Sequence, residues 1–246
     1  MIFDAFFIFA MGNQYFKFKQ FTINQDKTAM KVGTDGVLLG AWADISNAKN
    51  ILDIGCGTGL LSLMCAQRNS LAQIDSVEIE PHAAQQANQN FLNSPWSDRI
   101  NLFNTSILNF LPNKKYDAII CNPPYFTVNS KNCEQKRVMA RHCETLTHLD
   151  LIRIVADRLL SNNGKFHIIL PTNELKNFIE LSYLKKINPV NITYVKHTTK
   201  HPPKRSLITL SFTDSSIIKN ELILKNSDQK LTNNHIKLVR NFYLFL

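Results

Sequence analysis

The chain has 246 residues, 44% of them hydrophobic, which is enough for the buried core of one large α/β domain. Its 28 lysines and arginines outnumber 19 acidic residues, and the resulting charge of +9 at pH 7 fits either a polyanionic partner or a solvated basic surface. The five cysteines form no C-x-x-C pair and no even-numbered set, which argues against a disulfide framework or a structural metal site and predicts reduced thiols in a cytoplasmic protein.

The opening segment, MIFDAFFIFAM, is apolar but does not resemble a targeting or membrane segment. It has no cationic start and no small-residue cleavage site, and it is far shorter than the roughly 20 residues of a membrane span. We therefore expect no membrane partner. The polar, patterned part of the chain begins at Met11, which is a candidate start of translation. We predict an N-terminal extension over residues 1–15, with Met11 as the alternative native start, and one domain over residues 16–246.

Short β-rich apolar runs alternate with helix-like stretches from Asn50 onward. The expected strands cover 50–55, 74–79, 100–104, 116–121, 165–170, 191–197 and 205–212. The expected helices cover 60–68, 81–93, 148–160 and 173–186. This alternation predicts an α/β fold with a seven-stranded, mostly parallel sheet and helices on both faces, and the last two strands can pair as an antiparallel hairpin. Residues 221–246 are expected to form a small strand and a closing helix packed on the core.

A glycine-rich turn joins the first of these strands to the next helix. It contains Asp53, Gly55, Gly57 and Gly59. Glycines at such a turn allow positive φ angles and a close approach of a ligand, at the carboxyl end of a strand, where open α/β sheets bind ligands. A dinucleotide fingerprint would need a glycine where Leu60 stands, and the phosphate-loop lysine is missing. A turn that has an acidic residue and no lysine suits a cofactor that carries an amino-acid ammonium and a sulfonium.

The second strand ends at Glu78, beside the glycine-rich turn. A carboxylate at this strand tip can accept hydrogen bonds from both hydroxyls of a ribose. Pro81 suits the first turn of the following helix. The structural alternative is that Glu78 and Glu80 are solvated carboxylates that favour a helix N-terminus. Together, the acid, the glycine run and Glu78 resemble the class I methyltransferases that use S-adenosyl-L-methionine, which have a Rossmann-like fold.

The fourth strand is followed by Asn122, Pro123, Pro124 and Tyr125. An aromatic amine such as adenine N6 is a poor nucleophile, and two acceptors aimed at its hydrogens favour the pyramidal geometry that frees its lone pair. Asn122 offers a side-chain carbonyl and Pro123 a backbone carbonyl, which Pro124 holds in an extended conformation. Tyr125 can stack on a flat base. The alternative is that the two prolines merely end a strand and the tyrosine fills core.

This tetrapeptide resembles the N-P-P-Y signature of methyltransferases that modify planar nitrogens. Their targets are adenine N6 in DNA or RNA and the glutamine side chain of peptide-release factors. A release-factor glutamine methyltransferase would carry a helical substrate domain before the cofactor turn, where only about 50 residues stand here. A DNA adenine methyltransferase would carry a target-recognition domain. A third alternative, from another class, is a non-catalytic RNA-binding protein with a degenerate Rossmann fold.

The resemblance extends over most of the chain, which is similar to one bacterial family, the tRNA1(Val) adenine-37 N6-methyltransferases. The residues that carry it are 29–42, Ser94 to Trp96, 122–126, Ala140, Arg141 and 242–245. It implies that Asp53 and the three glycines hold the methionine end of S-adenosyl-L-methionine. It also implies that Glu78 holds the ribose and that residues 122–125 hold the target base of a valine tRNA. The oligomeric state stays open.

Two parts of the expected cofactor site have alternatives. The family usually has an acidic residue near the cofactor adenine, where this chain has Ser106. The serine hydroxyl can make that contact, or Asn104 or a backbone group can make it instead. In the segment before the first strand, Lys31 and Asp35 can cover the cofactor, or Thr34 and Asp35 can cap the helix that follows.

Basic residues gather in two segments expected near the mouth of the site. The first is the long segment after Tyr125, with Arg137 and Arg141, and the second lies between the last two strands, with Lys204 and Arg205. Long loops inside a compact domain are usually functional. We predict that these four side chains bind tRNA phosphates, the alternative being a solvated basic face.

Overall fold

The computed structural model describes residues 13–28, 30–124 and 146–245. Predictions for Tyr125, Arg137 and Arg141 lie outside the described residues, as does most of the predicted N-terminal extension. The first strand, β1 (Tyr15–Lys17), begins one residue before the predicted domain boundary.

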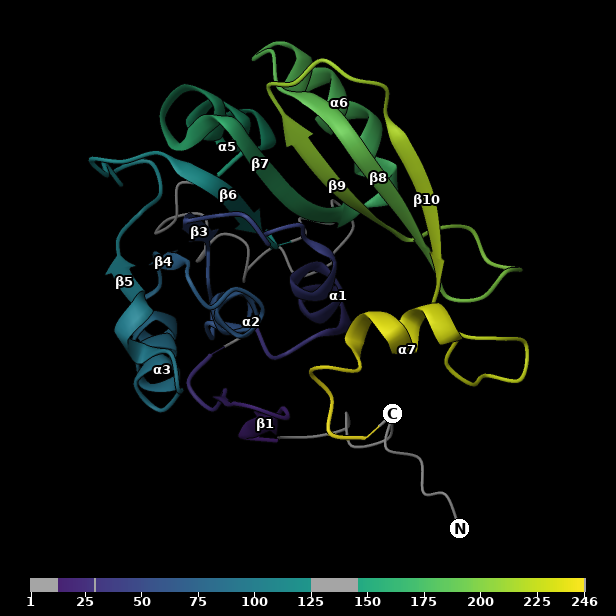
Figure 1. The fold of residues 1–246 in the computed structure, drawn as a ribbon, viewed down its shortest axis with the longest axis horizontal. Helices are drawn as coiled ribbons and strands as arrows, with labels where there is room; N and C mark the ends of the chain where they lie inside the picture. Colours follow the sequence, from purple (N-terminus) through teal and green to yellow (C-terminus); the bar gives the residue numbers. More distant parts are fainter. Residues whose placement is uncertain (1–12, 29, 125–145, 246) are drawn as a thin grey trace, which may run out of the picture.

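The core of the fold is an eight-stranded sheet (Figure 1). Its strands, in order across the sheet, are β10 (Ile218–Ile223), β8 (Asn188–Lys196), β9 (Arg205–Ser211), β7 (Leu160–Pro171), β6 (Tyr116–Cys121), β3 (Asn50–Ile54), β4 (Gln73–Glu78) and β5 (Ile100–Asn104). The five strands from β7 to β5 pair in parallel. β9 pairs antiparallel with both β7 and β8, which confirms the predicted final hairpin.

The sheet has one more strand than the seven predicted. The extra strand, β10, was expected to be a small strand packed on the core, but it pairs with β8 in parallel over six residues. Its side chains are exposed from Ile218 to Glu221, and only Leu222 is buried. Because edge pairing is made by backbone groups, such a strand leaves little hydrophobic pattern in the sequence.

Helices cover both faces of the sheet, as predicted (Figure 1). One face carries α1 (Thr34–Trp42), α2 (Leu60–Arg68), α3 (Pro81–Leu92) and α7 (Asn233–Val239). The other face carries α5 (His148–Ile154), the π-helical turn η2 (Val155–Leu159) and α6 (Leu175–Tyr183). The described residues also form two 3-10 turns, η1 (Ser97–Arg99) and η3 (Thr172–Glu174). The predicted helix 148–160 therefore ends in a π turn, and the predicted helix 173–186 is shorter than expected.

The segment before α1 is hydrogen-bonded to α3. β1 pairs with β2 (Thr22–Asn24), and the backbone N–H and carbonyl of Asn24 both bond to the side chain of Asn90, each at 2.9 Å. The Asn90 amide also donates to the carbonyl of Thr58 in the glycine-rich turn, at 2.9 Å. Asn90 therefore connects the N-terminal segment, α3 and this turn.

Two of the family-like sequence motifs contribute to the core. Phe242 is buried, and its carbonyl accepts a hydrogen bond from the N–H of Lys19 at 2.8 Å. Trp96 packs edge-on against Phe21, with ring centroids 5.9 Å apart. The C-terminal segment consequently lies beside β1 (Figure 1). These contacts show that the two motifs contribute to the stability of the fold.

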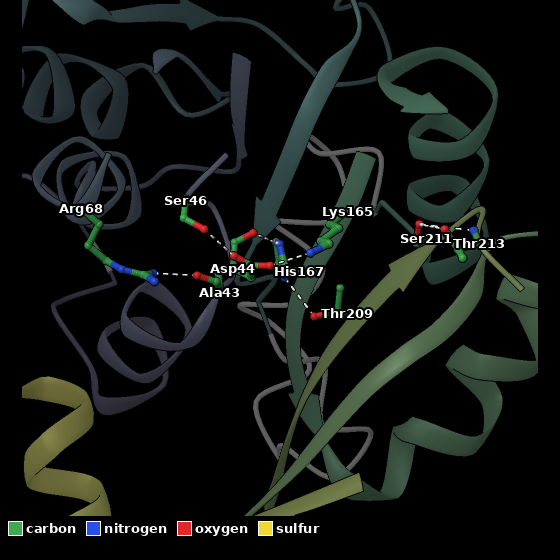
Figure 2. Close-up of polar contacts among 9 residues, drawn as sticks. All are labelled: Ala43, Asp44, Ser46, Arg68, Lys165, His167, Thr209, Ser211 and Thr213. Atoms are coloured by element: carbon green, nitrogen blue, oxygen red, sulfur yellow. Dashed lines mark hydrogen bonds and ion pairs between the residues drawn. The ribbon is translucent and has the colours of Figure 1, made fainter. Parts of the chain in front are cut away.

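A polar cluster joins the end of α1 to β7 and β9 (Figure 2). His167 is fully buried, with its Nδ1 3.0 Å from the hydroxyl of Thr209 and its Nε2 3.1 Å from the carbonyl oxygen of Asp44. The Asp44 carboxylate also accepts from Lys165 at 2.5 Å. Burial lowers the pKa of His167 to about 4. The imidazole is therefore neutral at pH 7 and acts as a structural group.

Candidate active site

The order of the strands brings the glycine-rich turn and Asn122 to the same place. From β3 the chain proceeds outward through β4 and β5, and then returns to form β6 on the other side of β3. This reversal is a topological switch point, where open α/β sheets bind ligands beside the carboxyl ends of the strands. Ile54 and Cys121 are direct neighbours in the parallel pair of β3 and β6. The residues that follow them, Gly55 and Asn122, therefore leave the sheet side by side.

The three glycines of the turn have positive φ angles but differ in their surroundings. Gly55 and Gly57 have φ angles of 69° and 55°, and apart from the adjacent residues no atom of the described part of the chain lies within 4 Å of the position that a Cβ would take on either. Gly59 has a φ of 84°, and a Cβ there would lie 2.3 Å from the ring of Phe91. Gly55 and Gly57 thus leave room for a ligand, whereas Gly59 allows α3 to pack against the start of α2.

Asp53 is fully buried beneath this turn. Its Oδ2 accepts hydrogen bonds from the backbone N–H of Ser62 at 3.1 Å and from the Ser62 hydroxyl at 2.6 Å. Its Oδ1 has no hydrogen-bond partner among the described residues. Desolvation raises the pKa of Asp53 to about 7, against the opposing effect of the Ser62 bonds. A buried carboxylate oxygen without a partner is costly, and a cationic or N–H-bearing ligand group would offset that cost.

Glu78 is buried at the tip of β4 and supports the turn. Its Oε2 accepts from the backbone N–H of Gly57 at 2.8 Å, and its Oε1 accepts from the N–H of Glu80 at 2.9 Å. Glu80 is the residue that caps α3, because its carboxylate accepts from the N–H groups of His82 and Ala83. A carboxylate has about four lone-pair positions, so both oxygens of Glu78 can still accept from a ribose.

Asn104 and Ser106, the residues expected near the cofactor adenine, each make hydrogen bonds within the protein. The side-chain amide of Asn104 donates to the carbonyl of Glu78 at 2.8 Å and so ties β5 to the tip of β4. Ser106 is half-buried, and its Oγ accepts from the N–H of Leu108 at 3.3 Å. This bond does not use the hydroxyl hydrogen of Ser106, which leaves the serine able to donate to a purine nitrogen.

Asn122 lies beside the first turn of α1, a proximity that sequence reasoning did not anticipate. A Cβ on Gly36 would lie 3.7 Å from Nδ2 of Asn122 and 3.0 Å from the side chain of Leu60, the first residue of α2. Asn122 and Pro123 are half-buried and Pro124 is exposed. The only signal for this proximity is Gly36 itself, a small residue directly before the apolar run Val37 to Leu39.

The predicted residues around α1 and β9 meet at the same edge of the sheet. Asp35 and Arg205 form an ion pair, with Oδ2 and Nε 2.7 Å apart. The N-cap of α1 is Gly33, without a side-chain cap bond, so the alternative in which Thr34 and Asp35 cap this helix is not what the structure shows. Lys31 is exposed.

Lys204 is exposed and precedes the first residue of β9. Its carbonyl accepts from Thr172, and its N–H donates to Val195. Because β9 runs antiparallel to β7, the start of β9 lies at the carboxyl edge, where Asn122 leaves the sheet. Lys204 is therefore placed at the candidate active-site edge with its ammonium toward solvent.

The donor set at the switch point fits S-adenosyl-L-methionine. Asp53 has an unpartnered oxygen for the ammonium, Gly55 and Gly57 have bare backbone, and Glu78 has acceptors for the ribose. Among residues 13–28, 30–124 and 146–245, no three His, Cys, Asp or Glu side chains form a group that could hold a metal ion. Within the same ranges, no helix is long and apolar enough to cross a membrane.

Comparison with known proteins identifies the family. Residues 30–176 match the family described as methyltransferase small domain. A protein from Flavobacterium psychrophilum named tRNA1(Val) (adenine(37)-N6)-methyltransferase is 44% identical over 93% of this chain and 99% of its own length. One of the same name from Aliivibrio salmonicida is 45% identical over 94% of this chain and 98% of its own length.

A solved structure, that of a "predicted O-methyltransferase" from Agrobacterium tumefaciens, has the same fold, with a TM-score of 0.68. It covers 85% of this chain and 96% of that one at 20% identity. The fold, the switch-point site and the similarity over nearly the full length agree. This chain belongs to the methyltransferase small domain family and, within it, to the family of the bacterial tRNA1(Val) (adenine(37)-N6)-methyltransferases.

Proposed function

We propose that this protein transfers a methyl group from S-adenosyl-L-methionine to the N6 amine of adenine 37 in tRNA1(Val). The observation that carries the proposal is the position of Asn122 beside the glycine-rich turn at the switch point, in a chain 44–45% identical to methyltransferases named for this reaction. The turn would hold the cofactor, and Asn122 would hold the amine next to it.

Asp53, Gly55, Gly57 and Glu78 would bind the cofactor. When bound, S-adenosyl-L-methionine supplies an electrophilic methyl group on a sulfonium. The carboxylate of Asp53 would accept from the ammonium and that of Glu78 from the ribose. Because Gly55 and Gly57 have no side chains, the cofactor could approach the backbone of the turn closely. Ser106 would donate to the adenine ring of the cofactor.

Asn122 and Pro123 would act on the target amine. Two carbonyl acceptors hold the two N–H bonds of the amine and favour its pyramidal form, in which the nitrogen lone pair is available for attack. These acceptors act most strongly in the transition state, because the N–H groups become more acidic as the nitrogen gains positive charge. No strong base is needed before the transition state. The sequence places Pro124 and Tyr125 beside them, the tyrosine as a stacking surface for the base.

The tRNA would bind along the carboxyl edge of the sheet. Lys204 is exposed there, and the sequence adds Arg137 and Arg141 in the segment that follows Tyr125. The net charge of +9 favours binding of a phosphate backbone. The reduced cysteines predicted from the sequence are consistent with the cytoplasm, where tRNA is modified.

The proposal is tested by nucleoside mass spectrometry of tRNA from a strain that lacks the gene. We expect loss of N6-methyladenosine from one valine tRNA and its return when the gene is restored. Restoration with the Asn122→Ala variant should not return it. Unchanged tRNA together with unmethylated release factors would overturn the proposal in favour of a glutamine methyltransferase.

A further inference from the structure

The first turn of α1 lacks a side-chain cap, so its position depends on contacts with other elements. Its N-cap is Gly33, which has no side chain to bond the exposed N–H groups. The first intrahelical bond, from the N–H of Val37 to the carbonyl of Gly33, is 3.3 Å long, beyond the usual range for N–H donors. A turn held this loosely by its own backbone needs an external anchor.

The ion pair between Asp35 and Arg205 provides that anchor. The two residues are 170 positions apart, and their side chains are only 25% and 32% exposed. The pair is charge-assisted and short, at 2.7 Å, and Asp35 also lies in the helix turn where a negative charge is favoured. The pair therefore joins the start of α1 to the start of β9.

Arg205 is itself held by rigid surroundings. It pairs with Pro171 in the antiparallel ladder of β7 and β9. Next to it, the hydroxyls of Ser206 and Thr172 are 3.1 Å apart, and the N–H of Thr172 donates to the carbonyl of Lys204. β7 in turn pairs with β6, the strand that delivers Asn122. The anchor is thus built on the same sheet as the candidate catalytic residue.

The turn that Arg205 anchors lies beside Asn122. Gly36 follows Asp35 directly and is buried, and a Cβ added to it would lie 3.7 Å from Nδ2 of Asn122. The carbonyl oxygen of the amide lies farther from this position than the nitrogen. The first turn of α1 therefore bounds the space on the nitrogen side of the amide, and a shift of this turn would change the space in which the amide is oriented.

We propose that Arg205, through Asp35, is a positioning residue that sets the orientation of the Asn122 amide by fixing the first turn of α1. The inference rests on the proposed function, because it assigns Asn122 the role of acceptor for the target amine. It gives Asp35 and Arg205 one shared task and replaces the separate roles, cofactor cover and phosphate contact, that the sequence predicted for them.

The test is a double-mutant cycle on the purified full chain with Asp35→Asn, Arg205→Ala and the double variant. The readout is the single-turnover methylation rate with tRNA and S-adenosyl-L-methionine both saturating. We expect each single variant to be about 10- to 100-fold slower, as for a misplaced reacting group, and the double variant to be no slower than the single ones. Arg205→Lys should keep most of the rate. The tRNA dissociation constant and its salt dependence should stay within about twofold of wild type.

A matched control is Asp157→Asn, which breaks the 2.6 Å ion pair with Lys185 on the opposite face of the sheet. This variant should keep the wild-type rate. Thermal melting checks that every variant is folded. If Arg205→Ala does not fold, the single-turnover rates of Asp35→Asn and Arg205→Lys test the inference. A normal rate for folded Asp35→Asn would overturn the inference. So would an Arg205→Ala variant with weaker, less salt-dependent tRNA binding and an unchanged saturated rate, since that result assigns Arg205 to a phosphate. A wild-type protein that makes no N6-methyladenosine would instead remove the proposed function.

Discussion

Glu78 accepts a hydrogen bond from the backbone N–H of Gly57 at 2.8 Å, so the tip of β4 directly supports the glycine-rich turn after β3. The same carboxylate accepts from the N–H of Glu80. One buried side chain therefore sets the shape of the turn and is also the proposed acceptor for the ribose of the cofactor.

Replacing Glu78 with alanine should weaken binding of S-adenosyl-L-methionine by roughly 1.5–3 kcal/mol, as for a lost charge-assisted hydrogen bond. Isothermal titration calorimetry measures this directly. Glu80→Ala is the matched control, because it removes only the cap of α3. Affinity for tRNA should hardly change in either variant. Normal cofactor affinity in Glu78→Ala would remove this residue from the site.

Cofactor affinity should depend on pH through Asp53, whose pKa is raised to about 7 by burial. The ordinary pKa of an aspartate is 3.8, so ionisation of Asp53 lowers the stability of the folded state as the pH rises from 3.8 to about 7. A bound ammonium offsets this loss of stability. Binding therefore selects the ionised form, and affinity should be about fivefold lower at pH 6 than at pH 7, a range in which the cofactor ammonium stays mostly protonated. Calorimetry in buffers of different ionisation enthalpy should detect proton release at pH 6. An equally steep profile in Asp53→Asn would assign the dependence to another group.

His167 should make the fold less stable in mild acid. Its pKa is about 4 in the folded protein and near 6.5 when unfolded, so the unfolded state binds the extra proton between these values. Stability is fully present above about pH 6.5 and is lost as pH falls toward 4, by about 2 kcal/mol between pH 7.5 and 5. Denaturant unfolding at both pH values, for wild type and His167→Gln, isolates this contribution. The same loss in the variant would show that other groups cause it.

Two glycines of the cofactor turn should respond differently to alanine. Gly59→Ala places a Cβ 2.3 Å from Phe91 at a φ of 84° and should cost the fold roughly 2–4 kcal/mol. The Cβ of Gly55→Ala would have no described residue other than its chain neighbours within 4 Å, so only backbone strain of about 1–2 kcal/mol is expected. Cofactor affinity should nevertheless fall in Gly55→Ala, because its Cβ occupies the space left for the ligand. Thermal melting and calorimetry on both variants separate the two effects, and equal losses of stability would contradict this packing.

Asn122→Ala should reduce the methylation rate about 10²–10³-fold while tRNA and cofactor still bind, by analogy with the loss of one transition-state hydrogen bond. Single-turnover kinetics at saturation measure this rate. Tyr125→Ala, whose role rests on the sequence, should weaken the complex by roughly 1–3 kcal/mol through lost base stacking. Near-normal turnover in Asn122→Ala would mean that the acceptor lies elsewhere.

The sequence predicted the elements that are largely buried and have clear boundary signals. Residues 60–68 were predicted as a helix and form α2 with the same bounds, because a glycine-rich turn starts it and its residues from Leu60 to Ala66 face the core. The sequence placed the two motifs of the candidate site after the first and fourth predicted strands, whereas the strand order that brings them together comes from the structure. In contrast, β10 joins the sheet mainly through backbone bonds and is exposed over most of its length, so its pairing left no readable pattern.

The individual contacts of the site were less accessible to sequence reasoning. The pairing of Asp35 with Arg205 depends on how α1 and β9 meet in space, and neither residue type requires it. The role of Glu78 as the acceptor for Gly57 likewise depends on the register of β3 and β4. The choice of partner among ionisable side chains at a sheet edge is decided by distances that emerge only from packing.

Methyl transfer to adenine 37 can be measured by incubating the purified protein with methyl-labelled S-adenosyl-L-methionine and two tRNA1(Val) transcripts that differ only at position 37. Nucleoside mass spectrometry should find N6-methyladenosine in the transcript with adenine 37 and no label in the one with guanine 37. Release factor is included as a third acceptor and should stay unlabelled. Equal labelling of both transcripts, or label on the release-factor glutamine and on neither tRNA, would contradict the account.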